Sequence, residues 1–145
     1  MTLNLLKLCV GASAISDLEN WIASRLALAQ AEGRPVEQFH TTRMVPKRAD
    51  ELLDGGSLYW VIKGQIAVRQ RLLQIRPHTD KDGIGRCDLV LEPVLIPVYP
   101  LPCRPFQGWR YLKSAEAPRD LNDGAENVAD LPESLRRELR EMGLL

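Results

Sequence analysis

Apolar and polar residues alternate along several short stretches of the chain, and a period of two predicts β-strands. The alternation slips at Leu72 and Leu73, which predicts a bulge or a bend within a long strand. Gly64 interrupts an apolar stretch, so we expect a break or a bulge there. The expected strands and extended segments are residues 2–10, 36–45, 57–63, 65–76, 87–92 and 94–99.

A helical period indicates the first helix. Ser16 and Glu19 have the spacing of a capping box, in which each side chain accepts a hydrogen bond from the backbone amide of the other residue. The helix is expected to continue to about Ala31, because Gly33 and Pro35 then end it. Its apolar face consists of Leu18, Ile22, Leu26 and Ala29, with Trp21 beside them as a core anchor.

Two shorter helices are expected further along the chain. Pro46 suits the first turn of a helix, so residues 47–53 are predicted to be helical and to end at the Asp54-Gly55-Gly56 turn. Residues 131–143 are predicted to form an amphipathic helix after a polar connection over residues 114–130. Prolines recur between residues 93 and 105, and they confine that portion to a sheet edge or to extended chain outside the ladder.

These elements favour the α+β class in a single domain that spans residues 1–145. Short strands with bulges, and two or three helices at the periphery, predict either a small β-barrel or a strongly bent mixed sheet. A doubly wound fold fits poorly, because only the first expected helix lies between strands at a suitable length.

The composition is that of an ordinary soluble globular chain, with 45% hydrophobic and 26% charged residues. The formal net charge is zero, but the charges are unevenly distributed. Residues 40–76 contain seven Lys or Arg and three Asp or Glu, whereas residues 114–145 contain four and eight. One surface is therefore expected to be basic, unless the acidic C-terminal part folds over it.

Cysteine and histidine usage makes several kinds of site improbable. The three cysteines have no CxxC spacing, so we expect free thiols in a reducing cytoplasm. With two histidines in the chain, no multi-histidine metal site is expected, and no cofactor is predicted. No apolar run approaches the ~20 residues of a membrane helix, so we expect a cytoplasmic protein without a membrane partner.

The sequence shows no catalytic motif. A nucleophile needs a base within hydrogen-bond reach, and neither His40 nor His78 lies in such a context. Asp50 and Glu51 are most simply the solvated face of a short helix. Cys103 is most simply an ordinary thiol. No catalytic residue is therefore assigned.

A mixture of cations and aromatic rings is the strongest chemical signal. It occurs in residues 42–76 and again in residues 104–113, and we expect the two segments to meet. Guanidinium groups bind phosphate, aromatic faces stack on bases, and Gln can read a base edge. The alternative is that the aromatic rings pack and the cations extend from the packed surface. The predicted ligand-binding residues are Arg43, Lys47, Arg48, Trp60, Lys63, Arg104, Phe106, Gln107, Trp109, Arg110 and Tyr111.

The motifs KLCVG, TRMVPKRADELLDGGSLYWVIKG and RPFQGWRYL resemble an uncharacterised bacterial family of domains of unknown function, whose members are small, single-domain and cytosolic. More remotely, the order of a short helix, a glycine turn and a barrel strand in KRADELLDGGSLYWVIKG is similar to the PUA-like superfamily, which includes the ASCH and EVE domains. This second resemblance implies a small PUA-like β-barrel with flanking helices that binds RNA or modified nucleobases.

Three hypotheses of function follow. The first is a non-catalytic module that binds RNA, another single-stranded nucleic acid or a modified nucleotide. The second is a protein-interaction module that uses the C-terminal helix and the proline-rich edge. The third is a small hydrolase of a nucleotide derivative, with Asp50, Glu51 or His40 as the base. The roles under the first hypothesis are phosphate binding by Arg43, Lys47 and Arg48, stacking by Trp60 or Trp109, and base-edge reading by Gln107.

Overall fold

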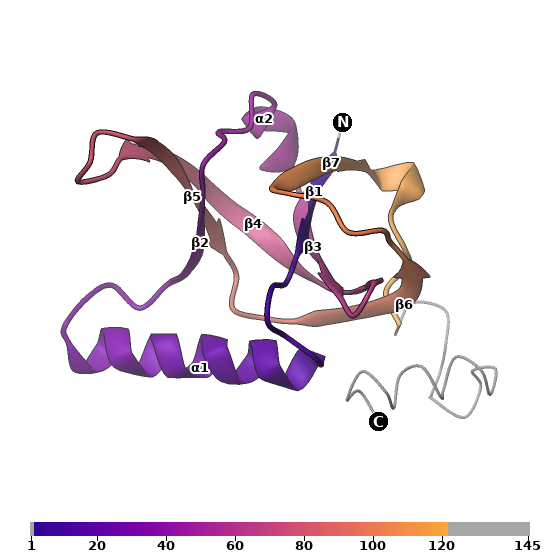
Figure 1. Ribbon diagram of the computed structural model, residues 1–145, viewed down its shortest axis with the longest axis horizontal. Helices are drawn as coiled ribbons and strands as arrows, with labels where there is room; N and C mark the ends of the chain where they lie inside the picture. Colours follow the sequence, from indigo (N-terminus) through magenta and orange to yellow (C-terminus); the bar gives the residue numbers. More distant parts are fainter. Residues whose placement is uncertain (1, 122–145) are drawn as a thin grey trace.

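The computed structural model describes residues 2–121 of the chain. In that range a mixed sheet of seven strands is accompanied by two α-helices and one turn of 3-10 helix (Figure 1). The strands are β1 (Leu3–Leu8), β2 (Gln38–Thr42), β3 (Ser57–Ile62), β4 (Gln65–Thr79), β5 (Gly85–Leu91), β6 (Ile96–Pro102) and β7 (Trp109–Lys113). The helices are α1 (Ile15–Ala31), α2 (Ala49–Leu52) and η1 (Ser114–Glu116).

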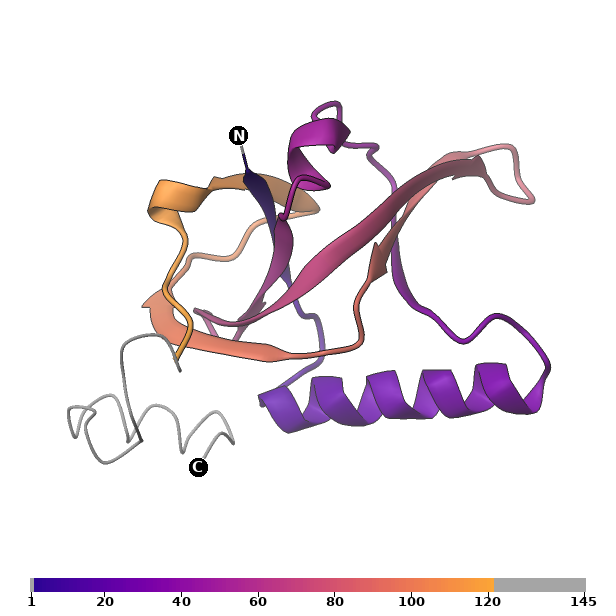
Figure 2. The ribbon, with the colours of Figure 1, turned by 180° about the vertical axis from the view of Figure 1, so that it is seen from behind.

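The sheet has the strand order β2-β5-β4-β3-β1-β7, and β6 also pairs with β4. β1 and β3 are parallel, and the other pairs are antiparallel. β4 is long enough to pair with β3 and β6 along its first part and with β5 along its second part. Figure 2 shows β4 running diagonally through the molecule and joining the two halves of the sheet.

These pairings confirm the α+β class. β2 and β7 lie at the two ends of the strand order, so the sheet formed by residues 2–121 is not closed into a barrel. Of the two architectures expected from the sequence, the mixed sheet is therefore present and the PUA-like barrel is not confirmed. The predicted amphipathic helix at 131–143 lies outside the described residues.

Both predicted irregularities in this region occur, the one at Gly64 in a different form. The register of β4 against β5 shifts between Leu72 and Gln74, as the slipped alternation predicted. At Gly64 the chain reverses instead of continuing in one strand. Lys63 has a φ of 51° and Gly64 a φ of 74°, and two positive φ values make a tight turn between antiparallel strands.

Helix α1 begins at Ile15, two residues before the position expected from a Ser16 cap, and is capped differently. The Asp17 carboxylate accepts hydrogen bonds from the backbone amides of Ser13, at 2.8 Å, and Ala14, at 3.3 Å. The capping box predicted at Ser16 was therefore wrong. Trp21 is 40% exposed, so its prediction as a core anchor was also wrong.

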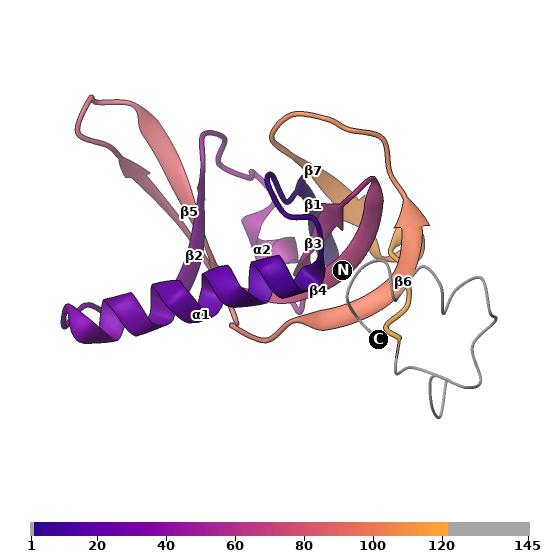
Figure 3. The same cartoon turned by 60° about the horizontal axis from the view of Figure 1, so that its bottom comes forward.

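The apolar core is divided between the two faces of the sheet. Leu5, Leu58 and Trp60 belong to the cluster that α1 and α2 cover, and the predicted stripe of α1 packs there through Leu18 and Ile22. A smaller cluster occupies the opposite face. Figure 3 shows α1 crossing in front of the strands, from the β1 side to beyond β2. This placement brings α1 beside β2 (Figure 3).

The proline-rich portion forms strand β6, paired with β4 on one side. On the other side, the Tyr99 amide donates to the Arg119 carbonyl oxygen at 2.9 Å, and the Leu121 amide donates to that of Pro97 at 3.0 Å. The predicted edge is thus partly covered by residues 119–121. In the part of the chain that the structure describes, no helix has the length and apolar content needed to span a membrane.

Candidate functional site

The two cation–aromatic segments meet, as predicted from the sequence. The Tyr111 hydroxyl accepts hydrogen bonds from the backbone amides of Lys47, at 3.1 Å, and Arg48, at 3.2 Å. The Trp109 indole donates to the Met44 carbonyl oxygen at 2.9 Å. Side chains of β7 therefore hold the loop that precedes α2.

In this contact the predicted ligand-binding groups already have partners. The Arg48 guanidinium binds the Glu51 carboxylate at 2.8 Å and lies 5.5 Å from the centre of the Tyr111 ring. The Arg110 guanidinium lies 4.6 Å from the centre of the Phe106 ring, and Trp109 is buried. The remaining cations and the amide lie exposed around this contact, at Arg43, Lys47, Lys63, Arg104 and Gln107. Ligand binding by these residues stays a prediction.

A concave site of similar chemistry lies between α1 and the strands β1, β2 and β3. It consists of two hollows of ≈ 150 and ≈ 430 Å³ that share Arg25, Gln38, Phe39 and His40 as lining residues. We call this site the α1 cleft. Trp60 is the predicted site residue that lines it. The further lining residues used below are Lys7, Cys9 and Trp21.

Strand register and helical spacing place the cleft residues. Lys7 on β1 lies opposite Trp60 on β3 and opposite Trp109 on β7, so the three residues occupy one row across the sheet. Paired residues share a face of the sheet, and this face is the one toward α1. Trp21 and Arg25 are four residues apart on α1, which places them one turn apart on the same side.

The cleft has an excess of positive charge. Burial lowers the pKa of Lys7. Burial, followed by the positive charges of Lys7 and Arg25, lowers the pKa of His40 to about 4, so the His40 imidazole is neutral at neutral pH. Among residues 2–121, no ion pair joins Lys7 or Arg25 to a carboxylate. Lys7 is thus partly withdrawn from water and Arg25 is exposed, and neither has a described counter-charge.

The polar groups near the cleft differ in what they can do. The His40 ring meets the Trp60 ring edge-on, with centroids 5.3 Å apart. Burial, and secondarily the charge of Asp17, raises the pKa of Cys9 to about 11, so Cys9 is a thiol rather than a nucleophilic thiolate at neutral pH. In the described part of the chain, no cluster of three His, Cys, Asp or Glu side chains could hold a metal ion.

Sequence reasoning missed most of the cleft. Lys7, Trp21, Arg25, Gln38 and Phe39 were not among the predicted ligand-binding residues, and His40 entered only as a possible base. Two local signals were present. Lys7 is the one charged residue of a largely apolar strand, Leu3–Leu8, and Arg25 follows Trp21 by one helical turn. Their convergence depends on how α1 crosses the sheet, which local pattern does not encode.

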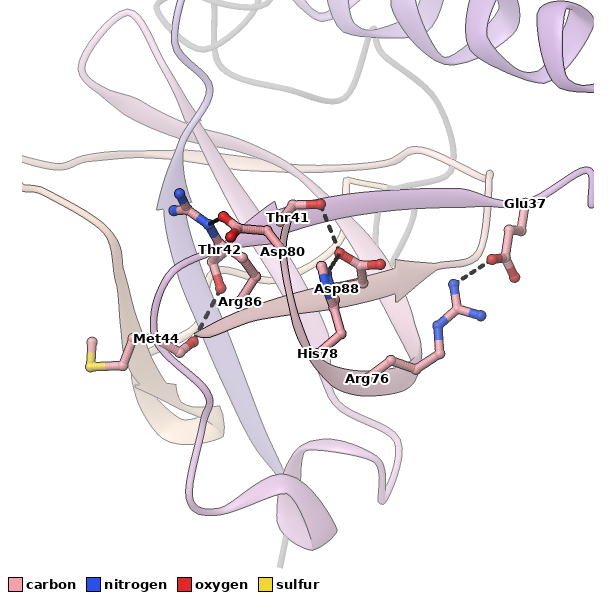
Figure 4. A network of polar contacts seen from close by, with 9 residues as sticks. All are labelled: Glu37, Thr41, Thr42, Met44, Arg76, His78, Asp80, Arg86 and Asp88. Carbon is pink, nitrogen blue, oxygen red and sulfur yellow. Dashed lines mark hydrogen bonds and ion pairs between the residues drawn. The ribbon is translucent and has the colours of Figure 1, made fainter. Parts of the chain in front are cut away.

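A second polar cluster joins β2, β4 and β5 beyond the cleft (Figure 4). Asp88 accepts a hydrogen bond from the Thr41 hydroxyl at 2.7 Å and lies 3.0 Å from Nε2 of His78. A hydroxyl nucleophile would require the imidazole between the hydroxyl and the carboxylate. Here the carboxylate lies in the middle, and Arg76 also pairs with Glu37. The cluster therefore braces three elements instead of forming a catalytic triad.

The fold and the cleft define an α+β protein with a mixed sheet and a helix-covered cationic site. Residues 5–145 match the model of a family described as protein of unknown function (DUF1489), and the chain belongs to that family. This confirms the resemblance to an uncharacterised family. The comparisons with curated proteins and with solved structures gave no match.

Proposed function

We propose that the protein binds a nucleotide, free or within single-stranded nucleic acid, in the α1 cleft. The observation that carries this proposal is the presence of two cations, Lys7 and Arg25, beside an aromatic wall and without a described carboxylate partner. Phosphate supplies the missing negative charge. Trp21, which is 40% exposed, supplies a flat face for a base, and stacking contributes ~1–3 kcal/mol per base; Trp60 lines the cleft as a buried ring.

The perturbed pKa values agree with an anionic ligand. Removing a lysine from water disfavours its charged form, and this cost lowers the pKa of Lys7. A bound phosphate would reverse that effect by stabilising the ammonium form. His40, which is neutral, would accept or donate a hydrogen bond without adding charge.

The test is fluorescence anisotropy with a short fluorescein-labelled single-stranded RNA, with adenosine, guanosine, cytidine and uridine monophosphates as competitors. Wild-type protein should bind at low salt and lose affinity as salt rises. Lys7→Gln and Arg25→Gln should each weaken binding about tenfold, the usual effect of losing one charge-assisted contact. Lys81→Gln, which removes an exposed cation from the turn before β5, is the matched control and should bind like the wild type.

The same assay separates the cleft from the surface predicted from the sequence. Arg48→Ala and Arg110→Ala remove two cations of that surface. If these variants lose binding while Lys7→Gln and Arg25→Gln retain it, the ligand binds at the 43–48 and 104–111 segments and the cleft assignment is wrong. If the wild-type protein binds neither the RNA nor any competitor at low salt, the proposed function is wrong.

We further propose that the protein is cytoplasmic and related to PUA-like domains. Its three cysteines are free, with Cys9 and Cys87 buried, which suits a reducing compartment. The order of α2, the glycine turn and β3 is what the PUA-like relationship would require. Superposition of an experimental structure on PUA-like domains tests this relationship, and an unrelated strand order would refute it.

A second candidate function is hydrolysis of a nucleotide derivative with His40 as the base. The specific observation in its favour is that His40 lines the same cleft as the two cations. A pKa of about 4 makes His40 a weak base, which favours binding over catalysis. Chromatography of the nucleotides after incubation with the protein tests this candidate. If a product forms with the wild-type protein and not with His40→Gln, the hydrolase is supported. If the nucleotides are unchanged, they are excluded as substrates.

A further inference from the structure

A buried chain of side-chain amides leads from the core to the α1 cleft. Gln70 on β4 is fully buried, and Gln38 on β2 is 5% exposed. Each amide donates to the oxygen of the other, with Nε2 of Gln38 3.2 Å from Oε1 of Gln70 and the reverse bond closing the pair. Gln38 lines both hollows of the cleft, whereas Gln70 lies behind it.

The orientation of Gln70 is fixed by two groups of opposite character. The Trp60 indole can only donate, and its Nε1 lies 2.9 Å from Oε1 of Gln70. The backbone carbonyl of Glu92 can only accept, and it receives Nε2 of Gln70 at 3.1 Å. A flipped Gln70 would place an N–H against the indole N–H and an oxygen against the carbonyl. Both Gln70 atoms are therefore assigned without ambiguity.

The fixed Gln70 in turn fixes Gln38. With its oxygen occupied by Trp60 and Gln38, and its nitrogen by Gln38 and Glu92, Gln70 has used its full hydrogen-bonding capacity. Gln38 has used half of its capacity. In the described part of the chain its Nε2 keeps one N–H, and its Oε1 keeps one lone pair, without a partner. A buried amide with half of its capacity open to a cleft can bind a further polar group, such as that of a ligand.

We infer that Gln38 is the residue that determines base specificity in the α1 cleft, by a hydrogen bond to the uncharged edge of a nucleobase. This inference rests on the proposed function and extends it. The edge of Gln38 on which N–H and oxygen lie side by side is occupied by Gln70. Gln38 consequently makes a single hydrogen bond to the base, from its remaining N–H or to its remaining lone pair, instead of a two-pronged contact.

The inference is tested by isothermal titration of the four nucleoside monophosphates and of ribose 5-phosphate, which lacks a base. Wild-type protein should bind its preferred nucleotide about tenfold more tightly than the weakest one, the scale of one hydrogen bond that is lost. In Gln38→Met this preference should disappear, while the affinity for ribose 5-phosphate stays unchanged. A methionine of similar length keeps the packing, cannot donate a hydrogen bond and is only a weak acceptor.

Three outcomes separate the inference from the function beneath it. If Gln38→Met keeps the wild-type order of nucleotide affinities, Gln38 does not read the base and the inference is wrong, although the function stands. If the wild-type protein binds none of the five probes, both fail. If Gln38→Met does not fold, the inference is tested on the wild-type protein by NMR. The signals of the Gln38 side-chain amide should shift on saturation with the preferred nucleotide. Unchanged signals overturn the inference.

Discussion

His40 is a neutral imidazole held between a tryptophan and two cations. Its pKa of about 4 is below the ordinary value of 6.5, because burial and then Lys7 and Arg25 disfavour its protonated form. Between these two pH values the unfolded chain binds a proton that the folded protein does not. Stability contributed by neutral His40 is therefore complete above pH 6.5 and is lost as the pH falls toward 4.

We predict a loss of up to about 3 kcal/mol from this group, which is the ideal limit for a shift of this size. Urea unfolding at about pH 7 and about pH 4.5 measures it. His40→Gln should reduce the fall in unfolding free energy between the two pH values, because glutamine does not titrate. Gln74→Ala, an exposed substitution of a group that does not titrate, is the control and should retain the wild-type fall. If the unfolding free energy falls equally between the two pH values in the wild type and in His40→Gln, the account is contradicted.

Gly56 is constrained by space. A Cβ at this position would overlap the carbonyl oxygens of Leu3 and Leu52, both backbone atoms that cannot move aside. We predict that Gly56→Ala lowers the unfolding free energy by about 3 kcal/mol, the cost of forcing backbone in a packed core to shift. Gly85→Ala, where an added Cβ meets nothing within 4 Å, should change it by less than about 1 kcal/mol. Similar urea midpoints for the two variants would contradict the prediction, because they would show that the backbone around Gly56 accommodates the added Cβ at little cost.

At the scale of elements, residues 117–121 are held to the sheet by backbone hydrogen bonds to β6 and by one ion pair. The Arg69 guanidinium on β4 binds both oxygens of Asp120, at 2.8 and 2.7 Å, and also donates to the Ser57 hydroxyl at 2.8 Å. The hydrogen bond to Arg69 lowers the pKa of Asp120. This pair fixes the segment that covers the outer side of β6.

We predict that Asp120→Asn costs about 1–2 kcal/mol of unfolding free energy, because a partly buried two-pronged contact is weakened but is still screened by nearby solvent. The matched control is Glu32→Gln, which removes the carboxylate of a half-exposed ion pair with Arg34 and should cost less than about 0.5 kcal/mol. Urea unfolding of the two variants side by side gives the comparison. A smaller effect at Asp120 than at Glu32 would refute the role of this pair.

Local pattern predicted the elements better than the site. The slip at Leu72, the turn that closes α2 and the apolar stripe of α1 are all encoded within a few residues, and each occurs. The α1 cap was mistaken because the N-cap is Ala14, and Asp17, at the third helical position, accepts hydrogen bonds from the Ser13 and Ala14 amides. The chain reversal at Gly64 likewise depends on which strand pairs with β3.

At the scale of the whole molecule, the cleft could not be predicted from local sequence patterns, because four elements that are separate in the sequence form it. Lys7, Arg25 and Gln38 come from β1, α1 and β2, and β3 supplies Trp60. The contact between the 43–48 and 104–111 segments was predicted, but its aromatic groups turned out to be bonded within the fold. The predicted combination of cations and aromatic rings also lines the α1 cleft, and ligand binding at either place stays a prediction.

The most direct test of the central claim maps the ligand on the protein by NMR. Backbone amide signals are followed while a nucleoside monophosphate, chosen as the tightest of the four competitors, is added. Our account predicts the largest shifts at Lys7, Arg25 and Gln38, with small shifts at Arg48 and Arg110. The largest shifts at Arg48 and Arg110, with Lys7 and Arg25 unmoved, would contradict it.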